Sequence, residues 1–299
     1  MIKERREYLF SLVIAITGSI LFAGKAIFIK LSYGYGASSE VLLALRMIFA
    51  FPLFWLVYFS TKQHQNLLKL NRSDLYKLCW LGFSGYFLSS YLDFLGLFYI
   101  SAGLERIVLY LTPAIVVLIS YFFLKKPISL LQWISIIIGY LGVIFAFIED
   151  LKANGSNGWL GVGLVFASAC LYANYLIFSG EIVERIGSIR LVTYASSFSA
   201  LCSVIQILFY SPRSILEQAY PVYWFSLGNA FFCTVLPMLM IMIAVQRIGS
   251  SLTAQSGILG PVATIFMGWY FLQENITLLQ IIGLVLVIFA VWLLMKNKA

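Results

Sequence analysis

The chain has 299 residues, of which 62% are hydrophobic and only 11% carry a formal charge. Too few polar residues are present to cover the surface of a water-soluble domain. The composition therefore excludes a water-soluble domain and indicates an integral membrane protein. The net charge of +8 would suggest a nucleic-acid partner in a soluble protein, but its distribution along this chain indicates membrane topology instead.

Ten apolar stretches have the length of a membrane-spanning helix, which needs about 20 residues to cross the hydrocarbon layer. In chain order they are Leu9–Leu31, Ser38–Ser60, Leu75–Tyr99, Ala102–Leu124, Leu130–Ile148, Trp159–Gly180, Ser188–Tyr210, Val222–Val245, Gly249–Leu272 and Thr277–Met295. The connections between them are too short for a soluble domain. We therefore expect an all-α integral membrane protein with ten transmembrane helices.

Basic residues gather on one side of the predicted membrane. With residue 1 in the cytoplasm, the inner side carries fourteen of them, namely Lys3, Arg5, Arg6, Lys62, Lys69, Arg72, Lys77, Lys125, Lys126, Arg185, Arg190, Arg247, Lys296 and Lys298. The outer side carries only Lys152 and Arg213, and the other four lie inside predicted helices. By the positive-inside rule we expect both termini in the cytoplasm and a multi-pass protein of the cell (inner, cytoplasmic) membrane.

The stretch Gly103–Gln132 returns later in the chain as Ser251–Gln280. An offset of 148 residues aligns Pro113 with Pro261, and the last glutamines of the two stretches with each other, without a gap. The alignment holds across two predicted helices and the turn between them. We interpret the chain as the product of a duplication.

A duplication predicts the domain organisation. Residues 1–150 form a first five-helix repeat, residues 151–158 a linker loop, and residues 159–299 a second repeat. Because five is odd, the second repeat must be inverted in the membrane. The two lysines at 125–126 agree with this, since they become glutamine and glutamate at 273–274, as an outward-facing turn tolerates. Inverted repeats are typical of secondary transporters.

Three stretches carry a family resemblance: KLSYGYGASSEVLLALRMIFAF from residue 30, YLDFLGLFYISAGLERIVLYLTPAIVVLISYFFLKKPISLLQ from residue 91, and GPVATIFMGWYFLQENITLLQIIGLVLVIFAVWLL from residue 260. The pattern resembles the EamA type of the drug/metabolite transporter superfamily. The resemblance implies ten helices in two inverted five-helix repeats around a central cavity, lined mainly by helices 1, 3, 4, 6, 8 and 9. It also implies small organic solutes, often amino acids, and often export. The family often has an acidic residue after the fourth helix, where this chain has Lys126; only Glu274 in the second half fits.

Six ionisable side chains lie inside predicted helices of the first repeat, all in the outer third of the membrane: Lys25, Lys30, Arg46, Asp93, Glu105 and Arg106. Each costs about 2.5–3.5 kcal/mol or more near the bilayer centre, so such residues are candidates for function. One interpretation is structural: Asp93 or Glu105 pairs with Arg46 or Arg106 and locks helices 2, 3 and 4. Under the other, the surplus of about two positive charges, with Lys25 and Arg46 as the positive pole, binds a carboxylate or phosphate of the solute.

Neutral polar residues add further candidates at helical spacing. One row lies on helix 3 and comprises Tyr86, Ser89, Ser90 and Asp93, and another on helix 6 comprises Ser168, Tyr172, Tyr175 and Ser179. These rows either bind solute or hold helices together through hydroxyl groups. Further candidates for solute binding are Tyr110, Asn174, Asn229 and Gln255. Candidate hinges, where proline or glycine weakens helices 4 and 9, are Pro113, Gly257, Gly260 and Pro261.

These observations favour a secondary transporter that moves an amino acid-like, zwitterionic or anionic metabolite by alternating access. Asp93 would allow proton-linked export or exchange if it loses its basic neighbour in one state of the cycle. A lipid or lipid-headgroup translocase on the same fold is the alternative, followed by an integral membrane enzyme, for which the sequence has no histidine cluster or paired carboxylates. We predict no enzymatic activity, cofactor, metal site or nucleic-acid partner; the expected partners are the solute and membrane lipids.

Overall fold

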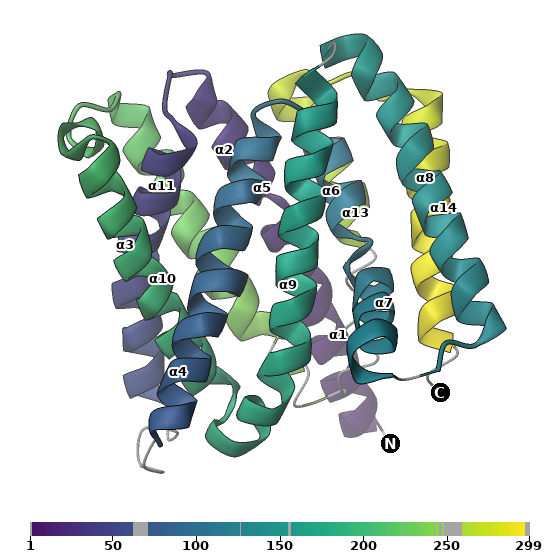
Figure 1. Cartoon of the computed structure of the whole chain (residues 1–299), viewed down its shortest axis with the longest axis horizontal. Coiled ribbons are helices and arrows are strands. Elements are labelled where there is room, and N and C mark those ends of the chain that lie inside the picture. The colour runs from purple at the N-terminus through teal and green to yellow at the C-terminus, as the bar shows by residue number, and fades with distance from the viewer. Residues whose placement is uncertain are drawn as a thin grey trace.

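The computed structural model describes residues 2–61, 71–125, 127–154, 157–241, 243–244, 247 and 259–296. These residues form helices joined by short turns, with no strand among them. The elements, labelled in Figure 1, are α1 (Ile2–Ala23), α2 (Lys25–Tyr33), α3 (Ser39–Ser60), α4 (Arg72–Leu81), η2 (Gly82–Leu88), α5 (Ser89–Leu97), α6 (Ala102–Leu109), α7 (Thr112–Leu124), α8 (Leu130–Asn154), α9 (Gly158–Ile186), α10 (Ser188–Tyr210), η4 (Pro212–Ile215), α11 (Tyr220–Ala230), η5 (Phe231–Val235), α13 (Leu259–Leu272) and α14 (Leu278–Lys296).

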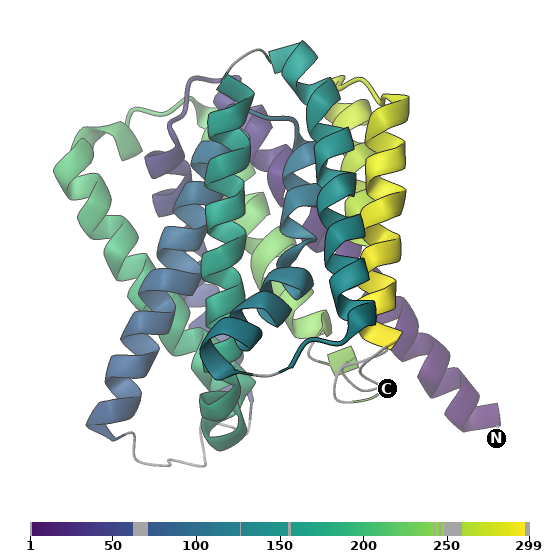
Figure 2. The same cartoon turned by 45° about the vertical axis from the view of Figure 1, so that its right-hand side comes forward.

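Seven stretches of these helices are long and apolar enough to cross a membrane, and the two shorter apolar helices are Leu259–Leu272 and Leu278–Leu294. The third predicted span is built from α4, η2 and α5 in succession. The arrangement fits the predicted ten-helix, all-α membrane fold. In both Figures 1 and 2 the start of α1 and the end of α14 lie at the same end of the bundle, as an even number of spans requires.

The helices pack in pairs that relate the two halves of the chain. The second predicted span, α3, packs along the seventh, α10, and the fifth, α8, packs along the tenth, α14. The third packs on the sixth through α5 and α9, and the first on the eighth through α2 and α11. Each span has a counterpart five places along the chain. When every span is replaced by its counterpart, the second–seventh and fifth–tenth pairs are unchanged, and the third–sixth pair becomes the eighth–first pair. This is the pattern expected of two repeats related by a pseudo-two-fold axis.

Two irregularities of the backbone recur at the 148-residue offset. The π-helical turn η2 in the first half has a counterpart, η5, in the second half. Lys125 and Gln273, 148 residues apart, are the non-glycine residues with positive φ among those described, at 51° and 57°. Both follow the last residue of a helix, α7 and α13, where a left-handed residue commonly ends the helix. The duplication inferred from sequence therefore extends to the local backbone.

The fourth predicted span is interrupted where Pro113 predicted a weak point. Helix α6 ends at Leu109, and α7 starts at Thr112 with Pro113 in its first turn, where its missing N–H costs no hydrogen bond. In the second half, Gly260 and Pro261 lie in the first turn of α13 and are buried. Their hinge role stays a prediction. The predicted hinge Gly257 and the predicted site residue Gln255 lie outside the described residues.

The first predicted span is also interrupted, at Gly24 between α1 and α2, which the sequence did not indicate. The amide groups of Ile27 and Phe28 both donate to the Gly24 carbonyl, at 3.1 and 3.3 Å. A Cβ atom on residue 24 would lie 3.2 Å from the Cys233 Sγ in η5. Glycine thus lets the interrupted first span approach the π turn of the eighth.

Candidate functional site

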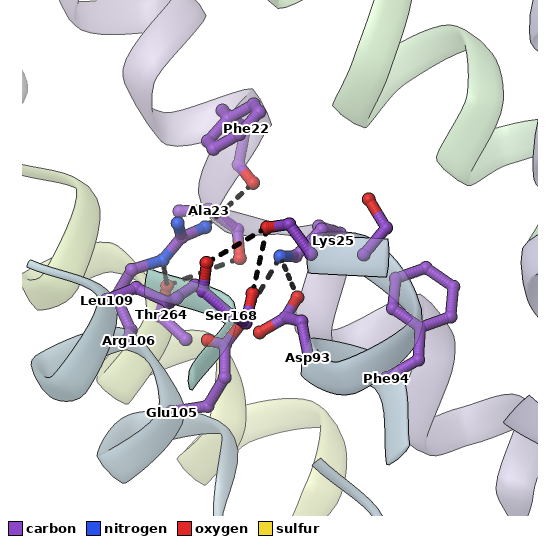
Figure 3. Close-up of polar contacts among 12 residues, drawn as sticks. Phe22, Ala23, Lys25, Asp93, Phe94, Glu105, Arg106, Leu109, Ser168 and Thr264 are labelled. Carbon is purple, nitrogen blue, oxygen red and sulfur yellow. Dashed lines mark hydrogen bonds and ion pairs between the residues drawn. The ribbon is translucent and has the colours of Figure 1, made fainter. Parts of the chain in front are cut away.

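A buried ionic cluster joins three helices, α2, α5 and α6 (Figure 3). The Lys25 ammonium group forms an ion pair with the Asp93 carboxylate and lies 3.3 Å from Oε1 of Glu105. The three side chains are 9%, 3% and 0% exposed, respectively. One ammonium group thus faces two carboxylates in a space almost without solvent, where charges are costly unless paired.

Local structure explains how the three groups meet. Lys25 is the first residue of α2, directly after the Gly24 interruption, and Asp93 lies in the middle of α5. Glu105 lies in the first turn of α6, where a carboxylate is favoured by the helix dipole. Neither oxygen of Glu105 nor Oδ1 of Asp93 has a well-aligned hydrogen bond within the described part of the chain. The cluster is therefore held by charge rather than by a complete hydrogen-bond network.

Arg106 binds the interrupted first span instead of a carboxylate. Its Nη2 donates to the Phe22 carbonyl at 2.8 Å, and its Nε donates to the Thr264 hydroxyl of α13 at 3.2 Å (Figure 3). The Thr264 hydroxyl lies 3.2 Å from the Ala23 carbonyl. The guanidinium also lies over the Phe22 ring, 5.2 Å from its centre. Arg106 and Thr264 therefore satisfy carbonyl groups at the end of α1, where helical hydrogen bonding stops.

Arg46 is the buried cation with the fewest partners in this layer. Its Nη2 donates to the Ser90 hydroxyl at 2.8 Å, and its Cζ lies 4.7 Å from the centre of the Phe94 ring. Its Nε has no hydrogen-bond partner among the described residues. Within the same set no carboxylate lies within 4.0 Å, although Asp93, Tyr86 and Cys233 are close enough to interact with it electrostatically.

These contacts correct the predicted pairing and the predicted charge surplus. The sequence suggested that Arg46 or Arg106 pairs with Asp93 or Glu105, but the carboxylates contact Lys25 because its long side chain reaches across from α2. Lys30 pairs with Glu274 of the second repeat, its Nζ 3.2 Å from Oε1. Glu274 therefore joins the layer, and four basic groups face three acidic ones, which leaves a surplus of one positive charge rather than two.

The polar row predicted on the third span divides between two neighbours. Ser89 contacts Ser168 of α9, with its hydroxyl 3.0 Å from the Ser168 hydroxyl, whereas Ser90 turns to Arg46 of α3. The Ser89–Ser168 contact holds two helices together, which is the packing role considered for this row. Ser90 and Asp93 instead belong to the charged layer.

Three tyrosines gather beside this layer. The rings of Tyr86 and Tyr175 meet edge to face with centroids 5.2 Å apart, and Tyr172 stacks on Tyr175 at 5.8 Å. Gly85 makes room for them, because a Cβ there would lie 2.4 Å from the Cβ of Tyr175. Tyr172 is 40% exposed, so an edge of the aromatic cluster is open.

The remaining predicted residues are less closely tied to the layer. Asn174 of α9 and Asn229 of α11 each have a buried Oδ1 atom without a hydrogen-bond partner among the described residues. Tyr110 lies at the interruption between α6 and α7. The sequence analysis did not select Thr264. It mentioned Glu274 only because the family often has an acidic residue at that position. The one available signal for Glu274 was its acidic character at a position where the first repeat has Lys126.

Comparison with known proteins places the chain in a family. A model of the EamA-like transporter family matches residues 9–148 and residues 159–296. The uncharacterized transporter YcbK of Bacillus subtilis (strain 168) is 32% identical over 286 residues, which cover 93% of this chain and 90% of that protein. The uncharacterized transporter sll1319 of Synechocystis sp. is 25% identical over 266 residues, covering 87% and 80%.

A solved structure described as "Crystal structure of protein" has the same fold, with a TM-score of 0.66, 14% identity and 95% of each chain covered. The two stretches that match the family together span nearly the whole chain and correspond to its two halves. The chain therefore belongs to the EamA-like transporter family.

Proposed function

We propose that the protein is a proton-linked secondary transporter that exports or exchanges a small, amino acid-like metabolite across the cell membrane by alternating access. The observation that carries the proposal is the layer in which Arg46, a buried cation without a carboxylate partner among the described residues, lies beside the Lys25–Asp93–Glu105 cluster. Family membership supports transport over an enzymatic role, because the relatives are named as transporters.

Arg46 has the properties of a residue that binds the solute carboxylate. One face of its guanidinium covers Phe94 and one nitrogen is held by Ser90, so the group is fixed in orientation while Nε remains without a partner. A planar guanidinium recognises a carboxylate through paired hydrogen bonds. Lys25 is already shared by Asp93 and Glu105, so it is the weaker candidate of the pair predicted from sequence.

The ionic cluster supplies the coupling. Because it has two carboxylates for one ammonium group, one negative charge remains after Lys25 is paired, and a proton can neutralise it. The ammonium group of a zwitterionic solute can take the same place, which releases the proton. A solute that binds Arg46 through its carboxylate and the cluster through its ammonium group therefore exchanges with a proton. This exchange drives export when the outside is acidic.

Transport into proteoliposomes tests the proposal. Vesicles that contain the purified protein and a trapped pH-sensitive dye are exposed in turn to amino acids, small carboxylic acids and lipid headgroups such as phosphoethanolamine. We expect a zwitterionic solute to move protons in the opposite direction, and the Arg46→Met variant to lose this response. Arg190→Met is the matched control, because Arg190 is also buried and also covers an aromatic ring but lies outside the layer. Equal loss in both variants would contradict a binding role for Arg46.

Asp93→Asn separates coupling from binding, because it keeps the shape of the side chain and removes its titration. The variant should lose its response to an imposed pH gradient while it still exchanges labelled solute. A full response to the gradient would exclude Asp93 as the coupling group. A response to phosphoethanolamine alone would favour the lipid-headgroup translocase instead.

A further inference from the structure

Glu274 connects the two repeats at one end of the bundle. Its Oε1 lies 3.2 Å from the Lys30 Nζ, and the amide of Ala102 donates to both of its oxygens, at 3.0 and 3.1 Å. Lys30 is in the last turn of α2, and Ala102 is the first residue of α6. One side chain of the second repeat thus holds the ends of two helices of the first repeat.

The backbone around Glu274 is shaped for this contact. Gln273 ends α13 in the left-handed conformation, and the Glu274 amide then donates to the Gly268 carbonyl at 3.1 Å. A Cβ on Gly268 would lie 2.9 Å from Oε2 of Glu274, so glycine leaves room for the carboxylate. On the other side, α6 leaves the Ala102 amide without a helical partner, and a carboxylate is the favoured group at that position.

The two repeats are in close contact next to Glu274. A Cβ on Gly103 would lie 2.2 Å from Nε2 of Gln280, the third residue of α14, and 3.1 Å from the Ile265 side chain of α13, so the first turn of α6 packs closely on the second repeat. The beginning of α9 is also packed here, since a Cβ on Gly161 would lie 2.6 Å from the Ile100 side chain. This closely packed end of the bundle lies opposite the start of α1 in Figure 2.

The exposure of side chains varies along α9. Val165 and Ala169, on the side of α9 that faces its neighbours, are both 0% exposed. Tyr172 and Leu176 lie on the same side of the helix, one to two turns farther from the Glu274 end, and are 40% and 41% exposed. Ser179, farther along the same side of the helix, is again buried at 8% exposed, so this side of α9 is exposed only around Tyr172 and Leu176.

The sequence does not repeat the Glu274 contact at the opposite end. At the 148-residue offset Glu274 corresponds to Lys126, and Lys30 corresponds to Phe178. Neither member of the ion pair is thus present at the equivalent position. At that opposite end the two repeats are joined by a different ion pair, between Asp74 of α4 and Arg185 of α9.

We propose that Glu274 is the latch of a gate at the end of the bundle that the charge distribution predicts to face outward. The inference rests on the proposed alternating access. Glu274 must release Lys30 and the Ala102 amide before the charged layer becomes accessible from outside. The contacts of Glu274 with Lys30 and the Ala102 amide stabilise the state that is closed to the outside.

Thiol labelling tests the latch without measuring transport. Cys233, 2% exposed and close to Gly24, is kept as the single cysteine after Cys79, Cys170 and Cys202 are replaced by alanine. A membrane-impermeant methanethiosulfonate reagent is then added to the outside of cells that produce the protein. We expect Glu274→Gln to raise the labelling rate of Cys233 about tenfold, because charge-assisted hydrogen bonds are lost from the closed state only.

Control variants make the result specific. Lys30→Met should raise the labelling rate less, since Glu274 would still bind the Ala102 amide. Glu217→Gln removes the same charge from an exposed position between η4 and α11 and should leave the rate unchanged. An unchanged rate in Glu274→Gln, in protein whose thermal unfolding is intact, would overturn the latch even if the protein transports solute. Faster labelling in a protein that transports nothing would instead uphold the latch and refute the proposed function.

Discussion

Replacement of Lys25 by methionine should destabilise the protein more than any other loss of a single charge in the layer. Methionine has a similar length and fits a buried site, so the change removes the ammonium group with little loss of packing. The carboxylates of Asp93 and Glu105, 3% and 0% exposed, then have no cation in contact with them within the described part of the chain.

The expected size of the effect follows from this burial. Removing one partner of a buried ion pair typically costs about 3–5 kcal/mol, because the charge left behind is uncompensated. For a chain of this size that corresponds to a fall in Tm of roughly 10 °C. Lys30→Met is the matched control: its ion pair is 22% and 18% exposed, so solvent screens it and we expect a loss of about 1 kcal/mol or less.

The assay is thermal unfolding in detergent of Lys25→Met, of the double variant Asp93→Asn/Glu105→Gln, and of the triple variant that combines all three changes. The triple variant has no charge in the cluster and should be more stable than Lys25→Met alone, by at least about 2 kcal/mol. If it is as unstable as Lys25→Met, the instability comes from packing, and the electrostatic account of the cluster is refuted.

Three further predictions concern packing and topology. Gly85→Ala should destabilise the protein by about 1–3 kcal/mol in thermal unfolding, because the new Cβ would lie 2.4 Å from the Cβ of Tyr175; Gly163→Ala, with open space around it, should be neutral or stabilising by up to about 1 kcal/mol. Gly283→Leu should separate α14 from α8, since a Cβ there would lie 2.4 Å from the Gly142 carbonyl, and a lower Tm than for Gly163→Ala would show it. A reporter enzyme that is active only outside the cytoplasm, fused to the last residue, should give no signal; a strong signal would contradict the predicted topology.

Most of the fold could be predicted from sequence because hydrophobic length and charge distribution act at the scale of whole helices. The third span was predicted from Leu75 to Tyr99, and α4, η2 and α5 cover Arg72 to Leu97. The interruption at Gly24 was not predicted, because an isolated glycine in an apolar stretch is compatible with a continuous helix. The close approach of Gly24 to Cys233 of the eighth span is a tertiary contact, which no local pattern records.

The residues of the charged layer could be predicted from sequence, but their contacts could not. Sequence places Lys25, Arg46, Asp93 and Glu105 at one depth, since the rise per residue of a helix is fixed. Which of them meet depends on how each helix is rotated and on how far a flexible side chain reaches. In the structure Lys25 contacts the carboxylates of Asp93 and Glu105, with which the sequence also allowed Arg46 to pair.

The paired π turns bear on how this protein arose. A π turn places one more residue in a helical turn than an α-helix does, and such turns are rare. Because η2 (Gly82–Leu88) and η5 (Phe231–Val235) match at the same offset that aligns the rest of the repeats, two independent insertions are not needed to explain them. A single insertion in an ancestral five-helix gene is sufficient. That insertion then predates the duplication, and the ancestral half-length protein already carried the irregular third helix that now contributes Ser90 and Asp93 to the charged layer.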